Sequence, residues 1–311
     1  MRDKILFGDC RNTLKQFDEK ARMCVTSPPY YGLRDYGGEQ SQIGQEQTPE
    51  EFIDELVKVF REVRNVLTDD GTCWVNLGDS YYNYRPGKGQ AYPKQTVSKT
   101  KQDLPDKVSK RGNKLEGLKE KDLIGIPWMF AFAMRKDGWY LRQDIIWHKP
   151  NPMPESVRDR CTKAHEYIFL FSKNKNYYYD NEAIKEPARD WGTRDRSKGK
   201  YHNAGSGLSP HTGLSKSYAT KNKRSVWSVT NKPYKGAHFA VYPPDLIEPC
   251  IKAGSEEGDI VLDPFMGSGT TALVAKSLQR HYIGCELHEE YGRLIQKRLS
   301  EKSFARLDFN E

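Results

Sequence analysis

The segment Ser27-Pro28-Pro29-Tyr30 combines residue types that suit chemistry on an amino group. It follows residues 22–26, an apolar run that is typical of a buried strand. Two consecutive prolines fix the backbone angle φ and continue neither a helix nor a sheet ladder, so the segment presents its carbonyls and side chains outward. Taken alone, the same four residues also fit an ordinary surface turn.

Methyl transfer to an exocyclic amino group of a base needs hydrogen-bond acceptors beside the nitrogen, whose lone pair is otherwise delocalised into the ring. The Ser27 hydroxyl and the Pro28 carbonyl could supply these acceptors, and the Tyr30 ring could stack on the base. A base in a duplex must leave the stack to reach such a pocket. A positively charged sulfonium donor would allow transfer by positioning and electrostatics, without a metal or covalent intermediate.

A second segment, residues 263–270 (Asp-Pro-Phe-Met-Gly-Ser-Gly-Thr), lies between a strand pattern and a helical pattern. Its glycines let the backbone turn tightly and approach a ligand, and the next strand ends at Glu286, placed to accept hydrogen bonds from ribose hydroxyls. A dinucleotide site or a tight turn would also fit a Gly-x-Gly pair, but position 272 is Ala where GxGxxG needs glycine. The arrangement resembles the S-adenosylmethionine loop of methyltransferases more than a nicotinamide or flavin site.

Strand and helix patterns alternate along the chain around these two segments. The expected strands are residues 4–8, 22–26, 72–77, 141–147, 166–172, 259–263 and 282–286. The expected helices are residues 49–67, 124–137, 243–253, 270–279 and 289–302. Alternation of this kind predicts an α/β fold with a mostly parallel twisted sheet and helices on both faces.

Positive charge is concentrated in two segments that contain few aliphatic residues. Residues 181–240 hold 12 Lys and Arg against 4 Asp and Glu, and residues 85–122 hold 11 against 5, whereas the whole chain has a net charge of +8. We expect a flexible basic loop over about 81–122 and an irregular basic insertion over 181–236. Such charge predicts a polyanionic partner, although a solvated basic loop is the simpler interpretation.

Several other classes of protein fit the sequence poorly. No apolar run approaches membrane-spanning length, and the first residues lead directly into a strand pattern, so we expect neither a membrane segment nor a signal peptide. The six cysteines show no metal-ligand spacing, which predicts reduced thiols, a cytoplasmic location and no bound metal. Cys250 follows a proline, as in enzymes that methylate carbon 5 of cytosine, but it falls within a helical pattern and is interpreted as a core residue.

These motifs and their order resemble the DNA amino-methyltransferases of the β arrangement, in which the catalytic motif precedes the cofactor motif. The resemblance covers essentially the whole chain and implies a Rossmann-like S-adenosylmethionine-dependent methyltransferase fold. It divides the chain into a catalytic half (residues 1–180), a target recognition region (181–236) and a cofactor-binding half (237–311). In that family, residues 238–244 would close over the methionine end of the cofactor.

The resemblance also assigns roles to individual residues. The catalytic residues are Ser27, Pro28, Pro29 and Tyr30. The cofactor-binding residues are Asp9, Cys10, Ser27, Asp263, Pro264, Phe265, Gly267, Ser268, Gly269, Thr270 and Glu286, with Asp9 at the adenine or the amino group. The expected DNA-binding residues are Arg189, Arg194, Arg196, Lys221, Lys223 and Arg224, mainly through phosphates.

The resemblance implies site-specific methylation of double-stranded DNA by base flipping, as in restriction-modification, with a possible homodimer and a possible cognate restriction endonuclease. Ser27 at the first position of the catalytic motif favours the N4 amino group of cytosine. Adenine N6 is the alternative, because the Asp or Asn more common in those enzymes accepts an amino hydrogen as a serine hydroxyl does. A DNA-binding module without catalysis would explain the charge but not the two motifs.

Overall fold

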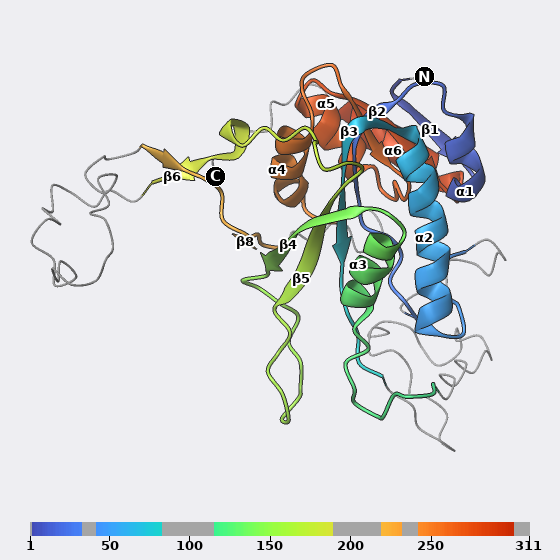
Figure 1. Cartoon of the computed structure of the whole chain (residues 1–311), viewed down its shortest axis with the longest axis vertical. Coiled ribbons are helices and arrows are strands. Elements are labelled where there is room, and N and C mark those ends of the chain that lie inside the picture. Colours follow the sequence, from blue (N-terminus) through green and yellow to red (C-terminus); the bar gives the residue numbers. More distant parts are fainter. Residues whose placement is uncertain (1, 33–41, 83–114, 189–218, 232–241, 302–311) are drawn as a thin grey trace, which may run out of the picture.

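An eight-stranded sheet organises the chain in the computed structural model, which describes residues 2–32, 42–82, 115–188, 219–231 and 242–301 (Figure 1). Its strands, in spatial order, are β1 (Lys4–Phe7), β10 (His281–Glu286), β9 (Ile260–Asp263), β2 (Ala21–Thr26), β3 (Leu67–Leu77), β5 (His165–Ser172), β4 (Tyr140–His148) and β8 (Val226–Ser228). Two further short strands, β6 (Glu186–Pro187) and β7 (Thr220–Lys221), form a separate antiparallel pair. The sheet brings the beginning and the end of the chain together.

The five strands from β1 to β3 are all parallel, and β5 is antiparallel to both of its neighbours. The mostly parallel sheet predicted from the sequence is therefore confirmed. Strands β2 and β9 are direct neighbours, with Met23 opposite Val261 and Cys24 opposite Leu262. Because parallel strands end at the same edge of a sheet, the segments that follow β2 and β9 meet there, although they lie far apart in sequence.

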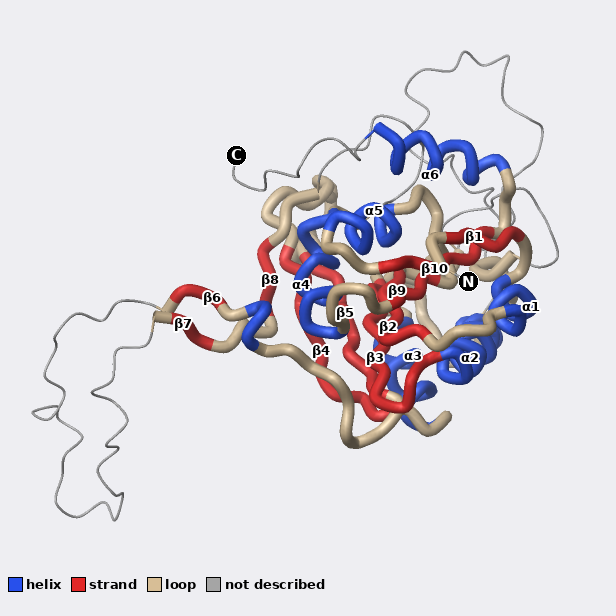
Figure 2. The backbone as a smooth tube through the Cα atoms, turned by 90° about the horizontal axis from the view of Figure 1, so that it is seen from above, coloured by secondary structure: helices blue, strands red, loops and turns tan. Residues whose placement is uncertain are grey.

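Helices cover both faces of the sheet (Figure 2). One face carries α1 (Cys10–Thr13), α2 (Pro49–Val66) and α3 (Ile126–Lys136), and the other carries α4 (Pro244–Gly254), α5 (Thr270–Ser277) and α6 (Glu290–Glu301). Alternate strand residues enter the two cores, as the pleat of a strand requires: Cys24 packs with α2, whereas Met23 and Val25 pack with α4. None of the helices that the structure describes has the length and apolar content needed to cross a bilayer.

Helix α2 shows how local sequence sets an element boundary. Thr48 accepts a hydrogen bond from the backbone N–H of Glu51, whose carboxylate in turn accepts one from the N–H of Thr48, and Pro49 follows at the first helical position. Phe52, Leu56, Val59, Phe60 and Val63 are all fully buried along one side of the helix. The predicted helix therefore forms, but it ends at Val66, and β3 begins directly at Leu67 rather than at Thr72.

The basic segments are described only in part. The predicted loop at about 81–122 falls mainly on residues 83–114, outside the described ranges, while its ends are joined by hydrogen bonds between Tyr82 and the backbone of Lys121 and Asp122. Within the predicted insertion 181–236, β8 adds to the edge of the main sheet beside β4. Ile184 and Trp227 are buried in the same core as α4. Ile184 and β8 of the insertion therefore pack on the catalytic core, whereas β6 and β7 pair only with each other.

Candidate active site

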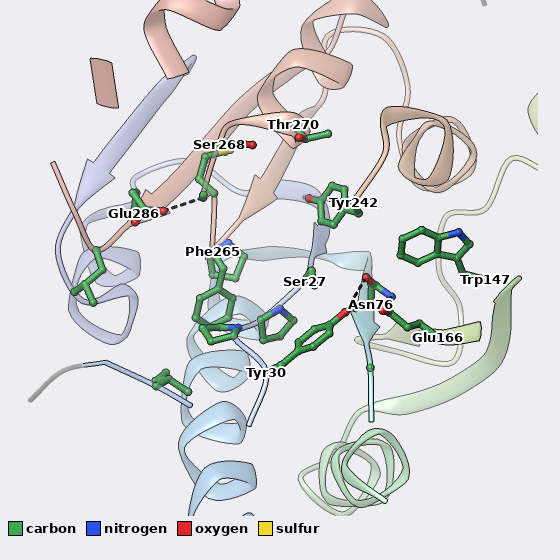
Figure 3. A pocket seen from close by; sticks show the side chains of 18 of the residues that line it. Ser27, Tyr30, Asn76, Trp147, Glu166, Tyr242, Phe265, Ser268, Thr270 and Glu286 are labelled. Atoms are coloured by element: carbon green, nitrogen blue, oxygen red, sulfur yellow. Dashed lines mark hydrogen bonds between the residues drawn. The ribbon is translucent and has the colours of Figure 1, made fainter. Parts of the chain in front are cut away.

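A cavity of about 600 Å³ opens at the carboxyl ends of the central strands, where the two predicted motifs meet (Figure 3). One end is lined by the segment after β9 and by Glu286 at the end of β10. The other end is lined by the segment after β2 and by residues of β3, β4 and β5. A cavity of this size and place in an α/β sheet is typical of a ligand site. Figure 3 shows Ser27 between Phe265 on one side and Asn76 on the other.

Glu286 ends β10 with a side chain that is largely buried yet lines the cavity. Its carboxylate accepts hydrogen bonds from the backbone N–H groups of Gly267 (2.8 Å) and His288 (3.2 Å). Burial raises the pKa of this carboxyl group, and those two hydrogen bonds partly offset the shift. The carboxylate is thus fixed in place by backbone N–H groups on two sides, one from the turn at Gly267 and one from His288.

The turn at residues 266–269 leaves space where a ligand can approach the backbone. Gly267 has φ of +53°, and a Cβ added there would meet no heavy atom closer than 3.8 Å. Gly269 has φ of +80°, and its Cβ would lie 2.7 Å from Ile295 of α6. The first glycine is open toward the cavity, whereas the second allows α6 to pack against the turn. The sequence alone does not distinguish these two requirements.

Arg298 of α6 holds the hydroxyl groups that follow this turn. Its guanidinium donates to the Ser268 carbonyl (3.0 Å), to the Ser268 hydroxyl (2.8 Å) and to the Thr270 hydroxyl (3.0 Å). Ser268, Thr270, Pro264 and Phe265 all line the cavity. Together with Glu286, they offer hydroxyl groups, an apolar ring and a carboxylate, which fit a cofactor with ribose, aromatic and charged parts.

Two predicted cofactor residues, Asp9 and Cys10, line the same end of the cavity from the turn after β1. Asp9 caps α1 by accepting from the Arg11 backbone (2.8 Å), and its carboxylate pairs with the Arg11 guanidinium (2.7 Å). The Cys10 thiol is buried, which raises its pKa, so it stays a neutral thiol. The turn after β1 therefore lies at the same end of the cavity as Glu286, although β1 belongs to the part of the chain that we assigned to the catalytic half.

Asp263 differs from the other predicted cofactor residues, because its side chain is buried behind the cavity wall and does not line it. Its carboxylate accepts from the hydroxyls of Thr26 (2.6 Å), Tyr242 (3.0 Å) and Thr271, and from the backbone N–H of Phe265 (3.0 Å). Burial raises the pKa of Asp263, and the hydrogen bonds partly counteract that shift. Asp263 thereby joins the end of β2, next to Ser27, to the cofactor segment.

Tyr30 is held at the opposite end of the cavity by a polar network. Its hydroxyl donates to the Glu166 carboxylate (2.6 Å), which also accepts from the Asn76 amide (3.1 Å) and the Lys149 ammonium. Burial raises the pKa of Tyr30, and the Glu166 charge adds to that shift, so the phenol stays protonated and remains a donor. The Tyr30 ring also lies against Gly78, where a Cβ would approach it to 2.7 Å.

Two further basic side chains, Lys163 and His165, line this end of the cavity. Burial lowers the pKa of Lys163, and it also lowers the pKa of His165, with the Lys163 charge as a second cause. His165 is therefore neutral at pH 7. The Tyr30 end of the cavity is thus lined by both hydrogen-bond donors and acceptors.

The expected DNA-binding residues are placed only in part. Lys221, Lys223 and Arg224 surround the Glu186 carboxylate at 3.9, 3.7 and 3.3 Å. Arg189, Arg194 and Arg196 lie outside the described residues. Of the predicted segment 238–244, Tyr242 lines the cavity and residues 238–241 lie outside the described ranges.

Residues 21–297 match a family model described as DNA methylase, the N6/N4 type. The chain belongs to the N6/N4 DNA methyltransferase family. The methyltransferase is 47% identical over 302 residues to the Type II methyltransferase M.SmaI of Serratia marcescens, covering 95% of this chain and 90% of that protein. It is 45% identical over 293 residues to M.Cfr9I of Citrobacter freundii, covering 94% and 86%.

Solved structures share the fold of this methyltransferase. TTHA0409 of Thermus thermophilus, crystallised with S-adenosylmethionine, matches with a TM-score of 0.60 and 23% identity, covering 97% of this chain and 95% of that one. The PvuII DNA methyltransferase, described as cytosine-N4-specific, matches with a TM-score of 0.63 and 19% identity, covering 98% and 89%. The predicted fold class and family are confirmed, and the cofactor of the methyltransferase is S-adenosylmethionine.

Several residues of the methyltransferase site were missed by sequence reasoning, chiefly Asn76, Glu166 and Arg298. Asn76 and Glu166 lie in predicted strands, and a polar residue in an otherwise apolar strand was the available signal. Arg298 lies in a helix with many charges, so nothing in the local sequence singles it out.

Proposed function

We propose that this methyltransferase modifies the N4 amino group of cytosine in double-stranded DNA, after the base has left the helix. The observation that supports this most directly is Ser27 at the centre of the cavity wall, between the cofactor end and the Tyr30 end. A hydroxyl at this position accepts an amino hydrogen without placing a second negative charge beside Glu166.

Bound S-adenosylmethionine supplies a methyl group on a positively charged sulfur. Glu286 and the backbone at Gly267 would hold its ribose, and Phe265 would pack against its adenine ring. Ser27 and the Pro28 carbonyl would accept the amino hydrogens of the base, while Tyr30, held by Glu166, would stack on its face. Since Thr26 is tied to Asp263 at 2.6 Å, the acceptor and cofactor segments keep a fixed separation, which positional catalysis requires.

Mass spectrometry of nucleosides tests the proposal directly. DNA incubated with the protein and isotopically labelled S-adenosylmethionine would be digested and separated against standards. We expect labelled N4-methylcytosine from double-stranded DNA and much less from the single strand. Labelled N6-methyladenine would refute the choice of base, and no labelled nucleoside would refute the proposed activity.

The setting of the enzyme is also part of the proposal. We infer a cytoplasmic enzyme with a cognate restriction endonuclease, because two relatives are Type II methyltransferases and all six cysteines are free thiols. A homodimer follows from the family resemblance. Protection of methylated DNA from a co-encoded nuclease and light scattering of the purified protein would test the two associations.

A further inference from the structure

Met153 is the most exposed large hydrophobic residue in the part of the chain that the structure describes, with 70% of its surface accessible. It lies in the connection between β4 and β5, which extends beyond the sheet as a narrow excursion (Figure 1). Met153 and Pro152 nevertheless line the cavity on the side of Lys149 and Glu166. A side chain that is both solvent-exposed and part of the wall lies at the opening of the cavity.

The backbone around Met153 is stiff. Pro150, Pro152 and Pro154 alternate through this stretch, and each fixes its own φ and restricts the residue before it. Asn151 anchors the stretch through two hydrogen bonds, since its amide donates to the Asn231 carbonyl (3.2 Å) and accepts from the Asn231 N–H (3.0 Å). The exposed thioether of Met153 is thus carried by a backbone that the prolines and the Asn151 hydrogen bonds restrain.

The excursion carries more basic than acidic side chains, with Lys149, Arg158, Arg160 and Lys163 against Glu155 and Asp159. Lys149 and Lys163 line the cavity on either side of the excursion, and Arg158 is exposed farther along it. A net positive charge on the segment that carries an exposed apolar side chain fits a surface that approaches the phosphates of a duplex. Isolated exposed apolar residues are common on protein surfaces, so the inference rests on the position of Met153 at the cavity opening and on its braced backbone.

We propose that Met153 enters the DNA helix at the place vacated by the target base. This rests on the proposed function, because a base that turns into the cavity leaves a gap in the stack beside the opening. Apolar side chains, methionine among them, can insert between base pairs, and the flexible thioether adapts to an irregular space. Met153 would then stabilise the open duplex without contacting the cofactor or the reacting amino group.

The test compares paired and unpaired targets at the recognition site, once methylation-sensitive sequencing has located it. One duplex carries the target base in its normal pair, and a second carries it opposite an abasic position, which lowers the cost of flipping. For Met153→Ala we expect kcat/KM to fall about tenfold on the paired duplex, a smaller loss than full burial of a methionine would give. On the abasic duplex the loss should stay within about twofold. Met153→Leu should retain most activity on both.

Two matched variants separate this role from others. Tyr140→Ala removes another exposed hydrophobic side chain, at the opposite end of β4 from Met153. It should leave kcat/KM unchanged on both duplexes. Arg158→Ala should weaken binding to both duplexes equally and reduce the salt dependence of that binding, as expected for a phosphate contact.

Equal losses for Met153→Ala on both duplexes, or no loss on either, would overturn the proposal. So would a change in oligomeric state on Met153→Ala, because the residue would then belong to an interface between protein chains. If the wild-type protein methylates no DNA, the proposed function itself fails, and that outcome is distinguished because it appears before any variant is compared.

Discussion

Replacing Gly78 with alanine tests whether the position of Tyr30 controls methyl transfer. The added Cβ would lie 2.7 Å from Cε2 of Tyr30, 3.3 Å from its Cζ and 3.4 Å from Cδ of Glu166. Ordinary contact begins near 3.4 Å, so the ring edge must withdraw by about 0.7 Å. Because a displacement of 1 Å can lower a rate by about 100-fold, we expect kcat to fall by about 10- to 100-fold.

The assay is single-turnover methylation with saturating DNA, combined with calorimetric binding of S-adenosylmethionine. Cofactor affinity should not change, because Gly78 lies against Tyr30, at the end of the cavity opposite Glu286. Gly254→Ala is a matched control: its Cβ would lie 2.9 Å from Sδ of Met23, far from Tyr30, so it should lower thermal stability and spare kcat.

A double-mutant cycle shows whether the effect passes through the ring. In a Tyr30→Ala background the ring that the added Cβ would displace is absent, so Gly78→Ala should have little additional effect on the rate. An unchanged kcat in the single variant, or an equal fall in both backgrounds, would refute the reasoning.

Four further predictions concern the proposed chemistry, the binding of the cofactor and the binding of DNA. Ser27→Ala should lower turnover at least 100-fold while leaving DNA affinity nearly unchanged, and wild-type turnover would remove the role given to the hydroxyl. Gly267→Val should abolish calorimetric binding of S-adenosylmethionine, because a β-branched residue at φ of +53° is strained and fills the open space beside the turn; unchanged affinity would place the cofactor elsewhere. The pKa of Glu286 is raised, so its negative charge is present above that pKa and is lost as pH falls through it. Cofactor affinity should therefore decrease from about pH 8 to about pH 5 more steeply in the wild type than in Glu286→Gln. Parallel curves for the two proteins would contradict this. DNA affinity should fall steeply between about 50 and 200 mM salt, and a flat response would count against the basic segments as phosphate contacts.

The elements of the core could be predicted from local patterns because each has a strong one. Apolar spacing and a capping box located α2, and the runs at β2, β9 and β10 are short, apolar and bounded by turn residues. Strand β8 could not be found in this way, because three residues in a basic, aliphatic-poor stretch carry no periodicity. Its pairing with β4 is a long-range contact, which local sequence does not encode.

The residues of the candidate site also differ in whether local sequence or long-range pairing puts them in place. Ser27, Tyr30 and Glu286 belong to motifs in which the order of residue types suggests a purpose, and the fold brings them to one cavity. Glu166 reaches Tyr30 only because β5 pairs with β3 in a particular register, where Asn76 lies opposite Ile168. Asp263 was predicted to bind the cofactor, but its position at the end of a buried strand directs its carboxylate to the hydroxyls of Thr26 and Tyr242 behind the cavity wall.

The pairing of β1 with β10 has a consequence for how the protein is made. Lys4 lies opposite Ile283, so β1 finds its neighbour in the sheet only after β10, far along the chain, has been synthesised. Asp9 and Cys10, which follow β1, reach the cavity only after that pairing. A contact of such sequence separation slows folding, because a long loop must close first. Chains that stop before β10 therefore lack the part of the cavity wall that Asp9 and Cys10 supply.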